Sequence, residues 1–136
     1  MPRKKTTAIA TTWGGLPAGS RVFVDTAPFI YVLESHLQFA ELFVGLFEAA
    51  ENGTLSIVLS TVTLAEVLTG PHKAGQTALA KRYEKVLCQY EVVPVSVPIA
   101  ALAAQLCAQH RLNLPGALQL ATALEAGASA FVTHDR

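Results

Sequence analysis

The sequence predicts an α/β fold in which a central, mainly parallel sheet is covered by helices on both faces. Four short runs rich in β-branched residues lack polar alternation, which is typical of parallel strands buried on both faces. Segments with helical periodicity separate these runs, and this alternation favours right-handed crossovers between parallel strands. A chain of 136 residues is long enough for one domain with its own core.

The expected domain covers residues 21–136. Residues 1–20 contain Thr, Gly and Pro without periodicity, so we interpret them as a flexible N-terminal arm. Short apolar runs then mark the expected strands at 22–24, 56–59, 92–95 and 130–133.

The first two expected helices follow from apolar spacing and stop signals. Residues 39–50 carry apolar side chains three and four positions apart, and Gly53 follows them. A short helix is expected at 64–68, because Thr residues suited to helix caps precede it and Gly70-Pro71 follows it.

Three more helices are expected in the second half of the chain. Apolar residues at helical spacing mark 79–90, and Pro98 suits the first turn of an Ala-rich helix at 99–110. The last helix is expected at 118–124, before the stop signal Gly127.

Composition argues against disorder and leaves nucleic-acid binding open. The chain is 51% apolar and 15% charged, with a formal net charge of zero. Its basic residues are grouped, however. One group lies at residues 3–5, and the other comprises Lys73, Lys81, Arg82 and Lys85. The second group either contacts phosphates or an acidic partner, or is only the solvated face of a helix.

Cysteine usage and the N-terminal segment predict a cytoplasmic protein. Cys88 and Cys107 lack metal-ligand spacing and stand in apolar helical contexts, so we expect buried, reduced thiols. The basic start is not followed by the apolar stretch of a signal peptide. No run approaches the roughly 20 apolar residues that cross a bilayer.

Three scarce carboxylates predict a metal site at the carboxyl edge of the sheet. Asp25 and Asp135 each follow an apolar strand, and Glu66 lies in the apolar helix after the second strand. Ligands of such sheets bind at this edge. Clustered carboxylates repel one another unless a cation lies between them, which favours Mg²⁺ or Mn²⁺ and phosphodiester hydrolysis.

Each acid also has an ordinary structural interpretation. Asp25 could cap the helix that follows it, with Pro28 in the first turn. Glu66 could be a partly exposed helix residue, and Asp135 a turn residue. The metal hypothesis therefore depends on all three acids lying together.

Three segments of the chain form a recognisable series: VDTAPFIYVLE (24–34), STVTLAEVLTGP (60–71) and LPGALQLATALEAGASAFVTHDR (114–136). In order and spacing they resemble the successive motifs of PIN-domain proteins, especially the VapC toxin ribonucleases of VapBC toxin–antitoxin pairs. The resemblance implies a three-layer α/β/α sandwich with four or five strands. It also implies a Mg²⁺- or Mn²⁺-dependent endoribonuclease, and it suggests a homodimer with a cognate antitoxin.

The resemblance assigns the family's acidic positions to Asp25, Glu66 and Asp135, but its third acid falls on Gly116. Glycine there removes a charge and a potential metal ligand, so metal affinity should fall. Three hypotheses remain open: a naturally degenerate member, a substitution made or selected because the intact toxin kills its host, and a weaker but active enzyme. We slightly favour a disabled copy of an active toxin.

Other positions have lesser expected roles. The hydroxyls of Thr26 and Thr133 could orient a carboxylate or a water molecule. We interpret Glu34 as a solvent-facing helix residue and His134 as a loop residue rather than a general base. The resemblance implies a short C-terminal edge strand after the last acid, but the sequence stops at Arg136. We expect either a sheet that is one strand shorter or a further segment that carries this strand.

Two functions remain in competition. The first is a metal-dependent ribonuclease that is weakened or inactivated at Gly116. The second is an inactive PIN-like module that acts by binding an antitoxin or another copy of itself. A phosphoacceptor domain is disfavoured because only one acid follows the first strand, and the motifs of serine hydrolases and phosphate-binding loops are absent.

Overall fold

The structure, a computed structural model, describes residues 13–134 and confirms the predicted fold class. Four parallel strands form one sheet in the order β3-β2-β1-β4. The strands are β1 (Arg21–Val24), β2 (Ser56–Ser60), β3 (Glu91–Val93) and β4 (Ala130–Val132). The helices among the described residues are the 3-10 turn η1 (Trp13–Gly15), α1 (Thr26–Leu33), α2 (Ala40–Glu51), α3 (Thr61–Lys73), α4 (Thr77–Leu87), α5 (Val97–His110) and α6 (Leu114–Glu125).

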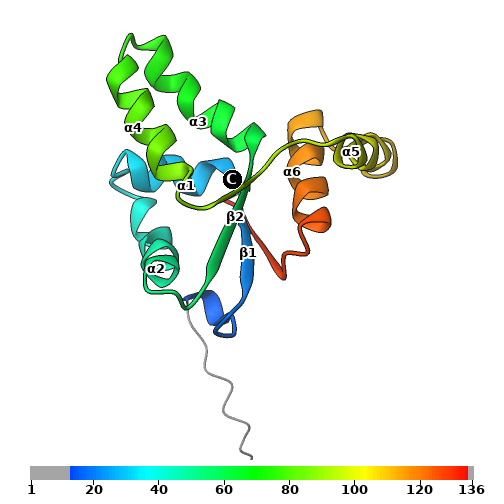
Figure 1. Cartoon of the computed structure of the whole chain (residues 1–136), viewed down its shortest axis with the longest axis horizontal. Coiled ribbons are helices and arrows are strands. Elements are labelled where there is room, and N and C mark those ends of the chain that lie inside the picture. Colours follow the sequence, from blue (N-terminus) through cyan, green and yellow to red (C-terminus); the bar gives the residue numbers. More distant parts are fainter. Residues whose placement is uncertain (1–12, 135–136) are drawn as a thin grey trace, which may run out of the picture.

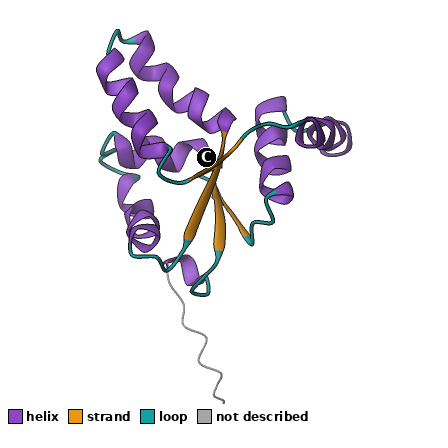
Figure 2. Ribbon diagram, viewed as in Figure 1, coloured by secondary structure: helices purple, strands orange, loops and turns teal. Residues whose placement is uncertain are grey.

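The helices form a layer on each face of the sheet. Helices α1 to α4 lie on one side and α5 and α6 on the other (Figures 1 and 2). Strand residues alternate accordingly: Val22 and Val24 pack in the cluster that contains Phe29, whereas Phe23 packs against Ala123. These strand residues are fully buried, which explains why the strands are apolar without alternation.

Polar caps begin the helices at the carboxyl edge of the sheet. Asp25 directly follows β1 and caps α1, while Ser60, the last residue of β2, caps α3. Asn113 caps α6 by accepting a hydrogen bond from the Gly116 amide. Capping satisfies backbone N–H groups that would otherwise lack partners, so polar side chains gather at this edge.

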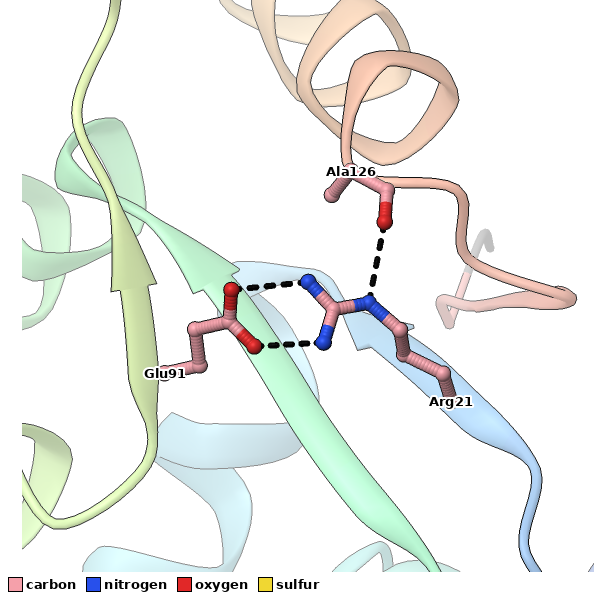
Figure 3. A network of polar contacts seen from close by, with 3 residues as sticks. All are labelled: Arg21, Glu91 and Ala126. Carbon is pink, nitrogen blue, oxygen red and sulfur yellow. Dashed lines mark hydrogen bonds and ion pairs between the residues drawn. The ribbon is translucent and has the colours of Figure 1, made fainter.

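At the opposite, amino-terminal edge of the sheet, Arg21 makes polar contacts with two other segments (Figure 3). Its guanidinium donates to both carboxylate oxygens of Glu91, at 2.5 and 2.7 Å, and its Nε donates to the Ala126 carbonyl at 2.9 Å. Arg21 lies in β1 and Glu91 in β3, so the ion pair reaches across β2. These hydrogen bonds lower the pKa of the Glu91 carboxyl.

Three sequence predictions are wrong in detail. Helix α3 continues through Gly70-Pro71 to Lys73, because Pro71 is buried by packing in the last turn and the chain turns only at Gly75, with φ of +72°. Strand β3 ends at Val93, before Pro94, which has no N–H to donate. Neither thiol is fully buried: Cys88, just after the end of α4, is exposed, and Cys107 in α5 is half-buried.

Part of the predicted arm lies against the domain. The Trp13 indole Nε1 donates to the Leu42 carbonyl at 3.1 Å, and its ring contacts Phe43. Residues 1–12 lie outside the described part of the chain. No helix within residues 13–134 has the length and apolar character needed to cross a membrane.

Candidate functional site

Asp25 is held at the end of β1 through both of its carboxylate oxygens. Oδ1 accepts hydrogen bonds from the Thr26 backbone N–H at 2.8 Å and from the Gln119 side-chain amide at 3.0 Å. Oδ2 accepts one from the Thr133 hydroxyl at 2.9 Å. Asp25 therefore caps α1, and its carboxylate also accepts hydrogen bonds from α6 and from the residue after β4.

Thr26 links Asp25 to Glu66. Its backbone N–H donates to Asp25, and its hydroxyl donates to Glu66 Oε1 at 2.5 Å. Glu66 is exposed on α3, and it lines the same groove of about 500 Å³ as Asp25. Two acids distant in sequence therefore meet at one groove. Asp135, the third predicted acid, lies outside the described residues.

The two supporting threonines that we expected both contact an acid. Thr26 contacts Asp25 and Glu66, and Thr133 contacts Asp25. The reason is topological, because β4 pairs with β1 and places Thr133 beside the end of that strand.

Gly116 lies in the first turn of α6 and lines this groove. It also lines a second groove of about 460 Å³, which shares Asp25 and Gln119 and extends to Thr133 and His134. An acid at position 116 would thus face the groove that holds Asp25. Position 116 therefore lies at the groove where the resemblance implies the third acid.

The sequence reasoning missed Gln119. Its side chain is only 2% exposed, and it contacts Asp25, Ser60 and Thr63. A signal was present, because Gln119 is a polar residue within the apolar segment of α6, one helical turn after Gly116.

His134 lies outside the helices and strands, just after β4, as expected of a loop residue, and it packs at the rim. Its ring contacts Tyr31, Phe39 and Phe43, and its Nδ1 is 3.1 Å from the Tyr31 hydroxyl. These contacts give His134 a packing role.

The donor set suits a hard cation with few protein ligands. The first groove has no Lys, Arg or His among its lining residues, and Asp25, Glu66 and Asn113 provide oxygen atoms to it. Mg²⁺ commonly uses one or two carboxylates and completes its octahedron with water. Within residues 13–134, no group of three or more His, Cys, Asp or Glu side chains could hold a metal ion. The described residues therefore fit Mg²⁺ or Mn²⁺ only as a two-carboxylate site.

Sequence comparison identifies the fold family. Residues 22–136 match the PIN domain. The chain belongs to the PIN-domain family. No curated protein of similar sequence was found.

Several solved structures have a fold similar to that of this PIN domain. A chain of a toxin–antitoxin complex from Klebsiella pneumoniae is 25% identical, with a TM-score of 0.63 over 83% of this chain and 86% of that chain. VapBC2 from Rickettsia felis, bound to a DNA fragment from its promoter, is 18% identical, with a TM-score of 0.67 and coverage of 85% and 87%. VapC20 from Mycobacterium tuberculosis, a toxin that cleaves the sarcin–ricin loop, is 14% identical, with a TM-score of 0.67 and coverage of 84% and 89%. The structural neighbours of this PIN domain thus include VapC toxins.

Proposed function

We propose that this PIN domain is a VapC-like, divalent-metal-dependent endoribonuclease whose activity is weakened or abolished by Gly116. The observation that carries the proposal is the pairing of Asp25 and Glu66 through Thr26 at one groove. Family membership supports the reaction class, because PIN and VapC proteins are nucleases. We propose the cytoplasm as its compartment.

Asp25, Glu66 and Asp135 are the proposed catalytic and metal-binding residues. A bound Mg²⁺ or Mn²⁺ would neutralise charge on the phosphodiester and lower the pKa of the attacking water. Asp25 and Glu66 would hold the ion through carboxylate oxygens. Thr26 and Thr133 would keep these oxygens in place, since each donates a hydroxyl proton to one of the acids.

The proposed substrate is RNA, bound through its backbone. Lys73, Lys81, Arg82 and Lys85 are exposed and available to phosphates, and such contacts position a strand without reading bases. The identity of the target RNA therefore lies outside this proposal.

A second function, that of an inactive binding module, is favoured by Gly116. A groove without the third acid would hold a metal ion weakly and still accept a partner. The proposed partners are a cognate antitoxin and a second copy of the chain. An antitoxin arginine could pair with Asp25 and Glu66 in place of the ion.

A cleavage assay with Mn²⁺ separates the two functions. It compares the natural chain, Gly116→Asp and Asp25→Asn, with Glu48→Gln as a control for an exposed acid on α2. Cleavage by the natural chain that Asp25→Asn abolishes supports a weak enzyme, and cleavage only by Gly116→Asp supports a disabled one. No cleavage by either, with copurification of a small partner, supports the binding module. Cleavage that survives Asp25→Asn overturns the proposed site.

A further inference from the structure

We propose that Gln119 is a positioning residue for Asp25, which it holds in one orientation at the groove. The expected effect of Gln119 on metal binding rests on the proposed function. The expected effect on the orientation of Asp25 depends only on side chains within the described residues. Of the two groove acids in the described part of the chain, Gln119 donates a hydrogen bond to Asp25 at 3.0 Å and none to Glu66. Its amide also reaches the Thr26 hydroxyl, at the longer distance of 3.4 Å, so we infer that it acts chiefly through the Asp25 carboxylate.

The Ser60 hydroxyl lies against the oxygen of the Gln119 amide. The Ser60 hydroxyl oxygen accepts the Thr63 backbone N–H at 3.1 Å, as the cap of α3. Its single proton is donated to Gln119 Oε1. Because the amide oxygen faces Ser60, the two N–H groups of the amide face the other way.

Both of these N–H groups have acceptors. Gln119 Nε2 donates to Asp25 Oδ1 at 3.0 Å and to Thr63 Oγ1 at 2.5 Å. A flipped amide would set its oxygen against the carboxylate of Asp25, where two acceptors repel each other. The network therefore has one favourable arrangement, in which Asp25 receives a proton donor from α6.

Burial makes the hydrogen bond from Gln119 to Asp25 effective in holding the carboxylate. Gln119 is 2% exposed, and Ser60 and Thr63 are fully buried. Losing the hydrogen bonds of a buried polar group is costly in free energy, so rotation of the Gln119 amide away from its partners is unfavourable. Thr133 holds the other oxygen of Asp25, and the carboxylate is thereby fixed from two sides. This burial also keeps Gln119 from contacting a phosphate.

The network connects the ends of two strands to the helix that carries Gly116. Asp25 follows β1, Ser60 ends β2, and Gln119 lies one turn after Gly116 in α6. The position of Asp25 is consequently set from the same helix that would carry the missing acid. Removing a side chain that orients a metal ligand typically lowers metal affinity by about 10- to 100-fold.

The first experiment measures Mn²⁺ affinity by calorimetry for the natural chain, Gln119→Met and Thr122→Val. Methionine keeps the approximate length of the side chain and removes its donors. Thr122→Val is the matched control, because Thr122 is also buried in α6 and its hydroxyl donates only to the Leu118 carbonyl. We expect about 10-fold or greater weakening for Gln119→Met and no change for Thr122→Val. Equal affinities for all three folded proteins would overturn the inference.

The second experiment does not depend on a metal ion. Metal-free crystal structures of the natural chain and Gln119→Met should differ at Asp25, whose carboxylate should rotate or adopt two orientations in the variant. If the methionine variant does not fold, Gln119→Glu keeps the side-chain shape and sets a carboxylate oxygen against Asp25. An unchanged Asp25 orientation in the folded variant would contradict the positioning role.

The two experiments separate this inference from the proposed function. A natural chain that binds no Mn²⁺ at millimolar concentration would reject the metal site, while the crystal structures would still decide the role of Gln119. A merely structural role would lower thermal stability for Gln119→Met and Thr122→Val alike and would leave Asp25 in place.

Discussion

A Cβ atom at Gly116 would lie 2.9 Å from Asn113 Oδ1, the same atom that accepts the hydrogen bond from the Gly116 N–H. The residue type at position 116 and the cap of α6 are therefore coupled. The backbone does not itself require glycine, because Gly116 is not among the glycines with positive φ. A side chain at this position needs only a small shift of the Asn113 carboxamide, which is the flexible end of its side chain.

Gly116→Asp should raise Mn²⁺ affinity by adding a carboxylate to the groove. Its free energy of unfolding should change by less than about 1 kcal/mol, since the favourable charge at the helix N-terminus and the loss of glycine offset the strained cap. Calorimetry and urea denaturation measure the two quantities. Gly116→Asn is the control of similar shape, and an equal gain in affinity for Asn would contradict a role for charge.

Thr26→Val should separate the two acids without removing the cap of α1. The backbone N–H that donates to Asp25 remains, whereas the hydroxyl that donates to Glu66 is lost. We expect roughly 10-fold weaker Mn²⁺ binding, measured by calorimetry, and a small change in stability. Thr26→Ser restores the hydroxyl and should recover the affinity; failure of serine to do so would count against the hydrogen bond.

Glu91→Gln should reduce the loss of stability at acidic pH. The pKa of Glu91 is lowered in the folded chain by its hydrogen bonds with Arg21, so the unfolded chain takes up the proton more readily. The stabilisation is present at neutral pH and is lost as the pH falls from about 4.3, the ordinary glutamate value, through the lower folded value.

The size of this effect is limited by solvent. The side chains of Arg21 and Glu91 are 36% and 50% exposed, so we expect less than about 1 kcal/mol. Urea denaturation between pH 7 and pH 3 measures it, with Glu48→Gln as the control on an exposed acid. Identical pH profiles for Glu91→Gln and the natural chain would refute this role of the ion pair.

Gly45→Ala should destabilise the domain although alanine favours helices. A Cβ atom at Gly45 in α2 would lie 2.8 Å from Trp13 Cδ1, so the indole must move. In a Trp13→Ala background the same change should become stabilising, by up to about 1 kcal/mol. Urea denaturation of the four proteins tests this, and a destabilising effect of equal size in both backgrounds would exclude the clash.

Much of the architecture was predictable from local pattern. Apolar strand runs, capping residues and stop signals identified the four strands and most helices, because these signals depend on neighbouring residues. The prediction failed where packing outweighed a local rule and where a helix ended earlier than its pattern indicated. Pro71 stays inside α3 because it is buried there, and Cys88 is exposed because α4 ends before it.

The candidate site was predictable only in part. Asp25 and Glu66 were expected at one edge because parallel strands end together, and both line one groove. The role of Gln119 was not predictable, since its partners Asp25, Ser60 and Thr63 are remote in sequence and only the fold brings them together.

By itself, the sequence determined the class of fold, the capped helix starts and the scarce acids at strand ends, because each depends on residue type and short-range spacing. The absence of an acid at position 116 is what the resemblance to PIN-domain proteins implies. Only the tertiary structure decided which donors hold those acids. Hydrogen bonds depend on distance and direction in space, and the packing of α6 against the sheet sets both for Gln119 and Asp25.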